Sequence, residues 1–217
     1  MHLPRPEEAR HHSQKKTLKY AEQLEPEIEQ ERQEWAQRVH GIGRDRFVFV
    51  DETNAKTTMT RLYGRAPVGE RVVEYVPDGR WESLTLVAAL SLEGATAALT
   101  YEGGTDSTTM LSFVEQVLVP TLKPGQIVVL DNLSSHKNAD VIAAIRAAGA
   151  DVWFLPRYSP DLNPIEEMWS KIKAWLRKTG ARVRDALIDA IGTALRQVTQ
   201  NDAKGWFNHC GYTNRRS

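Results

Sequence analysis

The chain has 217 residues, of which 41% are hydrophobic, and its 28 basic and 28 acidic side chains give a formal net charge of zero. This length and apolar fraction suffice for the core of one domain and exclude a wholly disordered chain, while the zero net charge does not by itself indicate a nucleic-acid partner. No apolar run in the sequence approaches the length of a membrane span, and the single cysteine, Cys210, cannot form an internal disulfide. We therefore expect a soluble, intracellular protein.

The first part of the chain, residues 1–42, is polar and rich in Glu, Gln and Arg. Its pattern predicts one helix near 18–39, strongly acidic over 22–34, followed by a break at Gly41 and Gly43. We expect an N-terminal arm or linker helix over 1–42, a main domain over 43–210 and a tail over 211–217.

The pattern of residues changes after residue 45, where short apolar segments alternate with turn-forming residues. RFVFVDE (46–52) reads as a strand, and TTMTRLYGR (57–65), SLTLVAALSL (83–92) and ATAALTYEGG (95–104) are predicted as further strands. Strands that follow one another with short links favour an antiparallel meander.

The second half of the chain alternates helices and strands. Helices are predicted over 105–119, 137–149, 164–178 and 183–199, and strands over 126–131 and 151–156. Such alternation indicates parallel strands joined by crossovers. The sequence thus predicts an α/β fold with a mixed sheet, an antiparallel meander followed by parallel strands, flanked by helices, which is the plan of the ribonuclease H-like fold.

Two aspartates stand at the predicted ends of apolar strands, Asp51 after FVFV and Asp131 after IVVL. Sites in open α/β sheets gather at such carboxyl ends, and two neighbouring carboxylates repel each other unless a proton or a cation lies between them. A hard divalent cation with oxygen ligands suits this pair. The alternative, for either residue taken alone, is that it begins a turn or caps a loop.

A third acid, Glu166, lies at the start of the helix in LPRYSPDLNPIEEMWSKIK (155–173). Asn163 is a good N-cap, and Glu166 three residues later has the spacing of a capping box, which would be a purely structural role. Prolines at 156, 160 and 164 stiffen the approach, and this stiffness favours a residue whose geometry must be held, such as a metal ligand. Helical periodicity places Glu166 beside the apolar stripe and Glu167 further into solvent.

Four segments taken in order, FVFVDET, RLYGRAPVGER, VVLDNLSSHK and LPRYSPDLNPIEEMWSKIK, resemble the catalytic domain of bacterial insertion-sequence transposases of the mariner superfamily, the "IS six-thirty" branch. The resemblance extends over roughly residues 15 to 210, and its combined motifs are specific. Thirty-four residues separate Asp131 from Glu166, the spacing expected of that superfamily.

The resemblance implies a DDE transposase with Asp51, Asp131 and Glu166 as catalytic residues and metal ligands. Two Mg²⁺ or Mn²⁺ ions would serve cleavage of element ends and strand transfer into target DNA. Double-stranded DNA is the implied partner, a homodimer is expected, and the chain would act in the bacterial cytoplasm at the nucleoid. Asn132 and His136 are assigned supporting roles, and for His136 a hydrogen bond near the start of the next helix is the alternative.

Basic residues could hold the DNA phosphates. Arg61, Arg65 and Arg71 follow the first acid, and Lys171 and Lys173 begin a basic segment over 171–184 that contains no acid. A solvated helix surface is the alternative explanation of the basic segment.

The chain departs from the family pattern at its N-terminus, because the arm is too short for the helix-turn-helix modules that precede the catalytic domain in relatives. The chain would be either the second reading frame of a split gene, in which an upstream reading-frame product supplies that module, or a decayed copy. The alternative function is a catalytically inactive or truncated regulator that binds DNA or the full-length transposase. A phospho-aspartyl receiver domain fits less well, since it would need a helix after the first acidic strand.

Overall fold

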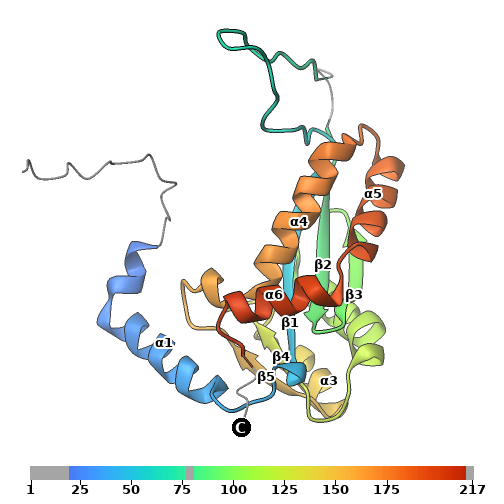
Figure 1. The fold of residues 1–217 in the computed structure, drawn as a ribbon. Coiled ribbons are helices and arrows are strands. Elements are labelled where there is room, and N and C mark those ends of the chain that lie inside the picture. The colour runs from blue at the N-terminus through green and yellow to red at the C-terminus, as the bar shows by residue number, and fades with distance from the viewer. Residues whose placement is uncertain (1–19, 77–80, 214–217) are drawn as a thin grey trace, which may run out of the picture.

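The computed structural model describes residues 20–76 and 81–213. Its centre is a five-stranded mixed sheet in the order β3-β2-β1-β4-β5 (Figure 1). β1 pairs with β2, and β2 with β3, in antiparallel fashion, whereas β1, β4 and β5 are parallel to one another. The strands are β1 (Phe47–Lys56), β2 (Ser83–Ser91), β3 (Gly94–Tyr101), β4 (Ile127–Leu130) and β5 (Asp151–Phe154). The predicted meander followed by parallel strands is therefore confirmed.

Helices cover both faces of this sheet. They are α1 (Pro26–Val39), α2 (Ser107–Phe113), α3 (Ala139–Ala147), α4 (Pro164–Thr179), α5 (Arg184–Arg196) and α6 (Gln200–His209). A π-helical stretch, Val114–Leu118, continues α2, and short 3₁₀ turns occupy Ala21–Leu24, Arg44–Arg46, Val119–Thr121 and Pro160–Leu162. None of the helices in the described parts of the chain is long and apolar enough to cross a membrane.

Side-chain alternation along the strands separates two cores. Phe47 and Phe49 of β1 pack in the core that contains the apolar residues of α4, α5 and α6, whereas Val48 and Val50 belong to the core with α2 and α3. This is the two-residue period of a strand whose faces are both covered. Figure 1 shows α4, α5 and α6 on the near face of the sheet and α3 beyond it.

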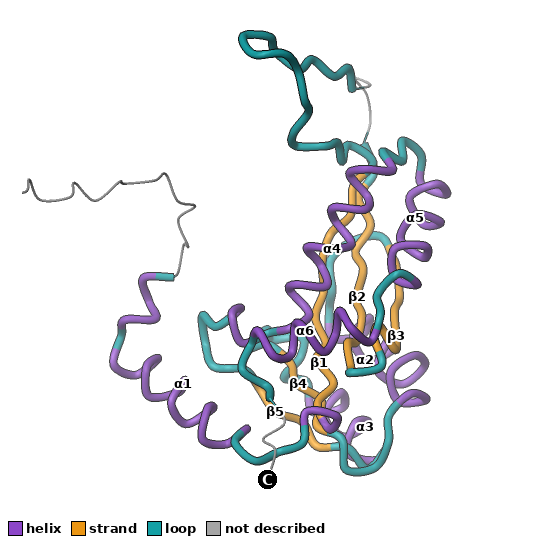
Figure 2. The backbone as a smooth tube through the Cα atoms, in the orientation of Figure 1, coloured by secondary structure: helices purple, strands orange, loops and turns teal. Residues whose placement is uncertain are grey.

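The predicted strand over 57–65 is wrong. β1 continues through Asp51 to Lys56 and pairs with β2 up to Ser83, after which the chain leaves the sheet. Residues 58–76 contain no helix or strand, and Figure 2 shows them as a loop projecting beyond the end of the sheet. The threonines of 57–65 have strand propensity, but the segment finds no neighbouring strand with which to form hydrogen bonds.

The predicted helix over 183–199 is confirmed as α5, which ends at Arg196, and a further helix that was not predicted, α6, begins at Gln200 behind a Thr199 capping box. In the predicted arm, Ile28 and Trp35 of α1 are buried. Tyr212, in the predicted tail, is also buried in the core. Contacts thus cross both predicted boundaries, at 42 and at 210.

Candidate active site

Asp51 and Asp131 lie level with each other on neighbouring parallel strands. The register pairs Phe49 of β1 with Val129 of β4, so the two aspartates, each two residues further on, continue that register. Strand alternation places both aspartates on the face of the sheet that packs against α4, the face of Phe49 and Val129. Asp51 was predicted to end its strand, but it lies within β1, just beyond the last residue that pairs with β4. The early end of β4 therefore opens the space beside Asp51.

Asp51 is buried, with 8% of its surface exposed. One carboxylate oxygen accepts the backbone N–H of Glu52 at 2.8 Å, and the other accepts the indole N–H of Trp169 at 3.1 Å. Burial, together with the charges of Glu166 and Asp131, raises the pKa of Asp51 to about 7 against the effect of these hydrogen bonds. A carboxylate in this environment favours a proton or a cation beside it.

Asp131 begins the loop after β4 and is held by two contacts. Its Oδ1 accepts the backbone N–H of Leu133 at 2.9 Å and lies 2.6 Å from Nδ1 of His136. The second contact is a close ion pair rather than an aligned hydrogen bond. The neighbouring Asn132 donates its side-chain N–H to the carbonyl of Leu155 and so ties the end of β4 to the end of β5.

His136 is fully buried between two acids. Its Nε2 lies 3.0 Å from Oε2 of Glu52, opposite the contact with Asp131. Burial alone would lower the pKa of His136, but the contacts with Asp131 and Glu52 outweigh it and raise that pKa to about 9. His136 is therefore a cation that links the loop after β4 to β1, and Glu52 is a functional candidate that sequence reasoning missed. Alternation along β1 was the available signal, since it places Glu52 on the face opposite Asp51.

Glu166 stands in the first turn of α4. Glu166 is exposed as a residue, but protein atoms around its carboxyl group displace part of the solvent there and raise its pKa; Lys173 opposes this rise, and the charges of Asp131 and Glu167 add to it. Asn163 occupies the predicted N-cap position, but its side chain makes no cap hydrogen bond, so the alternative role of Glu166 in a capping box is not formed. Its Oδ1 is buried and has no hydrogen-bond partner among the described residues.

The three predicted catalytic acids line one cleft. Its walls are the middle of β1, the loop after β4, the segment before α4, and Tyr20 from the arm; the lining residues include Asp51, Asp131, Asn132, Asn163 and Glu166. Glu167 is less exposed than Glu166, contrary to prediction, because it faces α6, where its Oε1 lies 3.6 Å from Nε2 of His209. Glu166 is nevertheless the one of the two that lines the cleft.

The donor set of this cleft suits a hard divalent cation in type, since it consists of carboxylate and amide oxygens. The raised pKa of Asp51 and the buried Asn163 Oδ1, which has no hydrogen-bond partner among the described residues, both favour a cation beside these oxygens. Within the described residues, however, no three His, Cys, Asp or Glu side chains are gathered closely enough to enclose one ion. The position of Glu166 relative to the two aspartates therefore decides how well the set can bind.

The predicted DNA-binding residues fall in three places. Arg61 lines a groove between the projecting loop and the end of α4, together with Arg177, Lys178 and Arg182. Arg65 and Arg71 are exposed on the same loop. Lys171 Nζ forms an ion pair with Asp202 of α6 at 2.5 Å and donates to the Gln197 carbonyl at 2.9 Å, which occupies it structurally. The positive charge of Lys173 instead favours the ionised form of Glu166 and so lowers the pKa of that carboxyl group.

Comparison with known proteins identifies the fold and the family. A model of the DDE superfamily endonuclease family matches residues 46–188, about two thirds of the chain. The chain belongs to this family. The matched range contains all three acids of the cleft, and the family's fold is the predicted ribonuclease H-like one.

Solved structures agree with the fold. The chain is similar to Mos1 transposase in a paired-end complex with the left transposon end, with a TM-score of 0.57 and 16% identity over 94% of this chain and 68% of that one. It is similar to the Mos1 strand transfer complex (TM-score 0.57, 15% identity, 95% and 67% covered). It also resembles the mariner Mos1 paired-end complex with Mg (TM-score 0.56, 15% identity, 93% and 68% covered). No curated protein sequence matches the chain.

Proposed function

We propose that this chain is the catalytic portion of a DNA transposase that cuts the ends of a mobile element and joins them to target DNA. The observation that carries the proposal is the single cleft lined by Asp51, Asp131 and Glu166, which come from three separate elements of a DDE-family fold. The similarity to Mos1 transposase, solved in complexes with transposon ends, supports the choice of substrate.

Asp51, Asp131 and Glu166 would hold two Mg²⁺ or Mn²⁺ ions, and Mos1 paired-end complexes have been solved with each metal. Bound there, the ions would supply a nucleophile at neutral pH and charge stabilisation at phosphorus. The chain's own residues prepare the site. Trp169 fixes the Asp51 carboxylate, and His136 fixes that of Asp131.

Both proposed reactions are in-line displacements at phosphorus. The oxygen of water, or of a DNA 3′-hydroxyl, forms a bond to phosphorus while the opposite phosphorus–oxygen bond breaks. The nucleophile loses its proton to solvent and the leaving oxygen gains one. Because the nucleophile attacks phosphorus directly, no covalent protein intermediate is required. One site therefore suffices for cleavage and for joining.

The finer assignments rest on the sequence motifs. We place the chain in the "IS six-thirty" branch, with a bacterial, nucleoid-associated location, because of the segments around Asp51, Asp131 and Glu166. A homodimer would bring two element ends together, and an upstream reading-frame product would supply the helix-turn-helix module.

Plasmid and element-end DNA, incubated with the chain and Mn²⁺ or Mg²⁺, tests the proposal. We expect metal-dependent nicking that is lost in Glu166→Gln and kept in the matched variant Glu167→Gln. Nicking that survives Glu166→Gln would exclude the assigned site. An inactive parent chain that still binds DNA would favour the alternative of a truncated regulator.

The basic groove of Arg61, Arg177, Lys178 and Arg182 is the proposed site for DNA phosphates. Removing one phosphate-binding side chain should reduce the slope of log affinity against log salt by about 1. We expect that reduction for Arg61→Gln and Arg177→Gln, but not for Lys123→Gln, which replaces an exposed lysine paired with Glu93. Unchanged slopes in the first two variants would remove this groove from the interface.

A further inference from the structure

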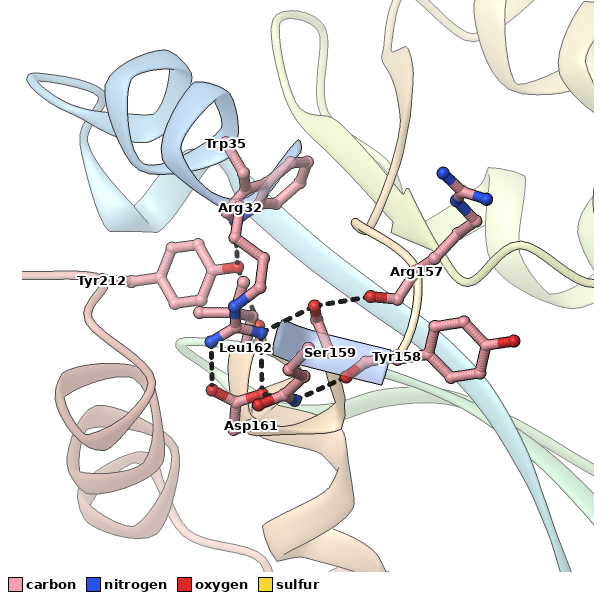
Figure 3. Close-up of polar contacts among 9 residues, drawn as sticks. Arg32, Trp35, Arg157, Tyr158, Ser159, Asp161, Leu162 and Tyr212 are labelled. Atoms are coloured by element: carbon pink, nitrogen blue, oxygen red, sulfur yellow. Dashed lines mark hydrogen bonds and ion pairs between the residues drawn. The ribbon is translucent and has the colours of Figure 1, made fainter. Parts of the chain in front are cut away.

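The arm helix α1 is fastened to the segment that leads into α4, here called the pre-α4 turn (residues 157–163). Arg32 forms a forked contact with Asp161, with Nη1 3.0 Å from Oδ1 and Nη2 2.7 Å from Oδ2. Nη1 also donates to Oγ of Ser159 at 2.7 Å. These partners are more than 120 residues apart in sequence, and Figure 3 shows the Arg32 side chain reaching both of them. Arg32 therefore joins the arm to the pre-α4 turn at two points.

Other bonds from the arm converge on the same turn. Gln23 donates to the carbonyl of Tyr158 at 2.6 Å. Trp35 of α1 donates to the hydroxyl of Tyr212 at 3.1 Å, and that hydroxyl donates to the carbonyl of Leu162 at 2.8 Å (Figure 3). The turn is thus held from the arm directly and through the buried Tyr212.

A second set of contacts holds the first residue of the turn. The guanidinium of Arg157 lies 2.8 Å from Glu27 and 2.7 Å from Glu31, both on α1. The backbone N–H of Arg157 also donates to Glu31 at 3.1 Å. The acidic face of the arm therefore serves to bind this turn.

The pre-α4 turn needs such support. Tyr158 has a φ of 52°, a left-handed conformation that is unfavourable for a residue with a side chain and persists where surrounding contacts impose it. The helix that follows lacks a side-chain cap from Asn163. The turn has local bonds of its own, since Oγ of Ser159 donates to the carbonyl of Arg157 at 2.9 Å and Pro160–Leu162 form a 3₁₀ turn. The contacts from the arm add to these bonds and hold the strained Tyr158 through its carbonyl.

We propose that α1 is a positioning element of the active site, in which Arg32 holds the pre-α4 turn and thereby sets where Glu166 stands relative to Asp51 and Asp131. This inference rests on the proposed function of the cleft. The three acids line the cleft but are not gathered closely enough to enclose one ion. The affinity of the cleft for a cation would therefore depend on small shifts in the position of Glu166. Tyr20 of the arm also lines the cleft, with its ring 6.0 Å from that of Tyr158.

Positioning can be separated from folding because the Arg32–Asp161 pair is partly exposed, with side-chain exposures of 22% and 45%. Pairs of this kind contribute little to global stability. The buried Ile28 and Trp35 anchor α1 to the domain. Loss of Arg32 should therefore loosen the turn while α1 stays in place.

Arg38 provides a matched control. It lies on the same helix and also contacts the domain, but its guanidinium stacks 3.6 Å from the ring centre of Trp153 on β5, and it forms no hydrogen bond or ion pair with the pre-α4 turn among the described residues. The full chain would be compared with Arg32→Ala, Arg38→Ala and the charge exchange Arg32→Asp with Asp161→Arg. Amide hydrogen exchange over 158–167, Mn²⁺ affinity by calorimetry, and kcat and KM for nicking are the measurements.

We expect Arg32→Ala to speed amide exchange in the turn, to weaken Mn²⁺ binding by roughly tenfold to a hundredfold and to lower kcat with KM for DNA unchanged. Arg38→Ala should match the parent in all three, and the charge exchange should restore Mn²⁺ binding in part. Parent-like exchange and Mn²⁺ affinity in Arg32→Ala, or equal losses in Arg38→Ala, would overturn the inference. A parent that binds Mn²⁺ without nicking DNA would refute the proposed function, yet exchange and Mn²⁺ affinity would still decide the role of Arg32.

Discussion

Trp169 on α4 donates its indole N–H to Asp51 on β1 across 118 residues of sequence, at 3.1 Å. Trp169 is 2% exposed and packs in the core. The helix that brings Glu166 to the cleft therefore also orients the buried aspartate. One element thus couples two of the three acids.

Replacing Trp169 by Phe keeps an aromatic ring in the core but removes this hydrogen bond. We expect a loss of about 1–3 kcal/mol in the free energy of unfolding, from the smaller ring and the missing bond, and a higher Mn²⁺ concentration for half-maximal nicking. Urea unfolding and metal titration would measure the two effects. Trp175→Phe, on the same helix, should leave the metal requirement unchanged; an equal shift there would argue against a role of the indole N–H.

The buried charge of Asp51 should cost stability when no metal is present. Its pKa is raised from 3.8, the ordinary value of an aspartate, to about 7 in the fold, so the folded state holds the proton more tightly. The resulting stability is fully present below pH 4 and is lost as pH rises through about 7. In a chelating buffer at pH 8, we expect the free energy of unfolding of Asp51→Asn to be about 1–3 kcal/mol higher than that of the parent. The difference should be smaller at pH 5.

Urea unfolding at the two pH values would test this expectation. Asp189→Asn, an exposed change on α5, is the matched control and should track the parent. An Asp51→Asn variant less stable than the parent at pH 8 would mean that the carboxylate is a net stabilising group in the metal-free fold.

The nearness of Asp51 and Asp131 could be predicted because it follows from local rules. Strand alternation sets the face on which each aspartate lies, and parallel pairing of apolar strands sets their level. Glu166 could be assigned from the start signals of its helix. The contacts that orient these acids could not be predicted, since Trp169, His136 and Arg32 reach them, or the turn before Glu166, from distant elements.

His136 is expected to be a structural requirement of the site. It is fully buried between Glu52 and Asp131, and removing one partner of a buried ion pair leaves an uncompensated charge. We expect His136→Ala to lower the free energy of unfolding by about 3–5 kcal/mol. Adding Glu52→Gln should recover part of that loss, because the unpaired charge is then absent.

His209→Ala is the control for this prediction. His209 has 74% of its side chain exposed and lies 3.6 Å from Glu167, so its loss should change stability by less than about 0.5 kcal/mol. A His136→Ala variant as stable as His209→Ala would show that the buried contacts contribute nothing.

Asp202 should stabilise the fold by joining α6 to α4. Burial alone would raise its pKa, but hydrogen bonds from Lys171 and Thr199 outweigh this effect and lower the pKa to about 2. A depressed pKa gives stability that is present above the unfolded value near 4 and is lost as pH falls through about 2. We expect Asp202→Asn to lower the free energy of unfolding, measured with urea, by about 1–2 kcal/mol at pH 7 and by less at pH 3. A loss that is equal at both pH values would assign the effect to packing instead.

One wrong prediction has a clear physical origin. The segment 57–65 has strand-forming residues but leaves the sheet. Local propensity was overruled there by pairing elsewhere, since β1 itself pairs with β2 up to Lys56. Propensity predicts what a segment can form, while tertiary contacts decide whether it does.

The most direct test of the account is calorimetric titration of Mn²⁺ into the parent chain, Asp131→Asn, Glu166→Gln and Glu167→Gln, without DNA. The account predicts that the parent and Glu167→Gln bind Mn²⁺ with similar affinity, whereas Asp131→Asn and Glu166→Gln lose at least tenfold, roughly the size of effect seen on removing a partner of a metal site. Equal affinity in the parent and Glu166→Gln would contradict the claim that these three carboxylates form one metal site.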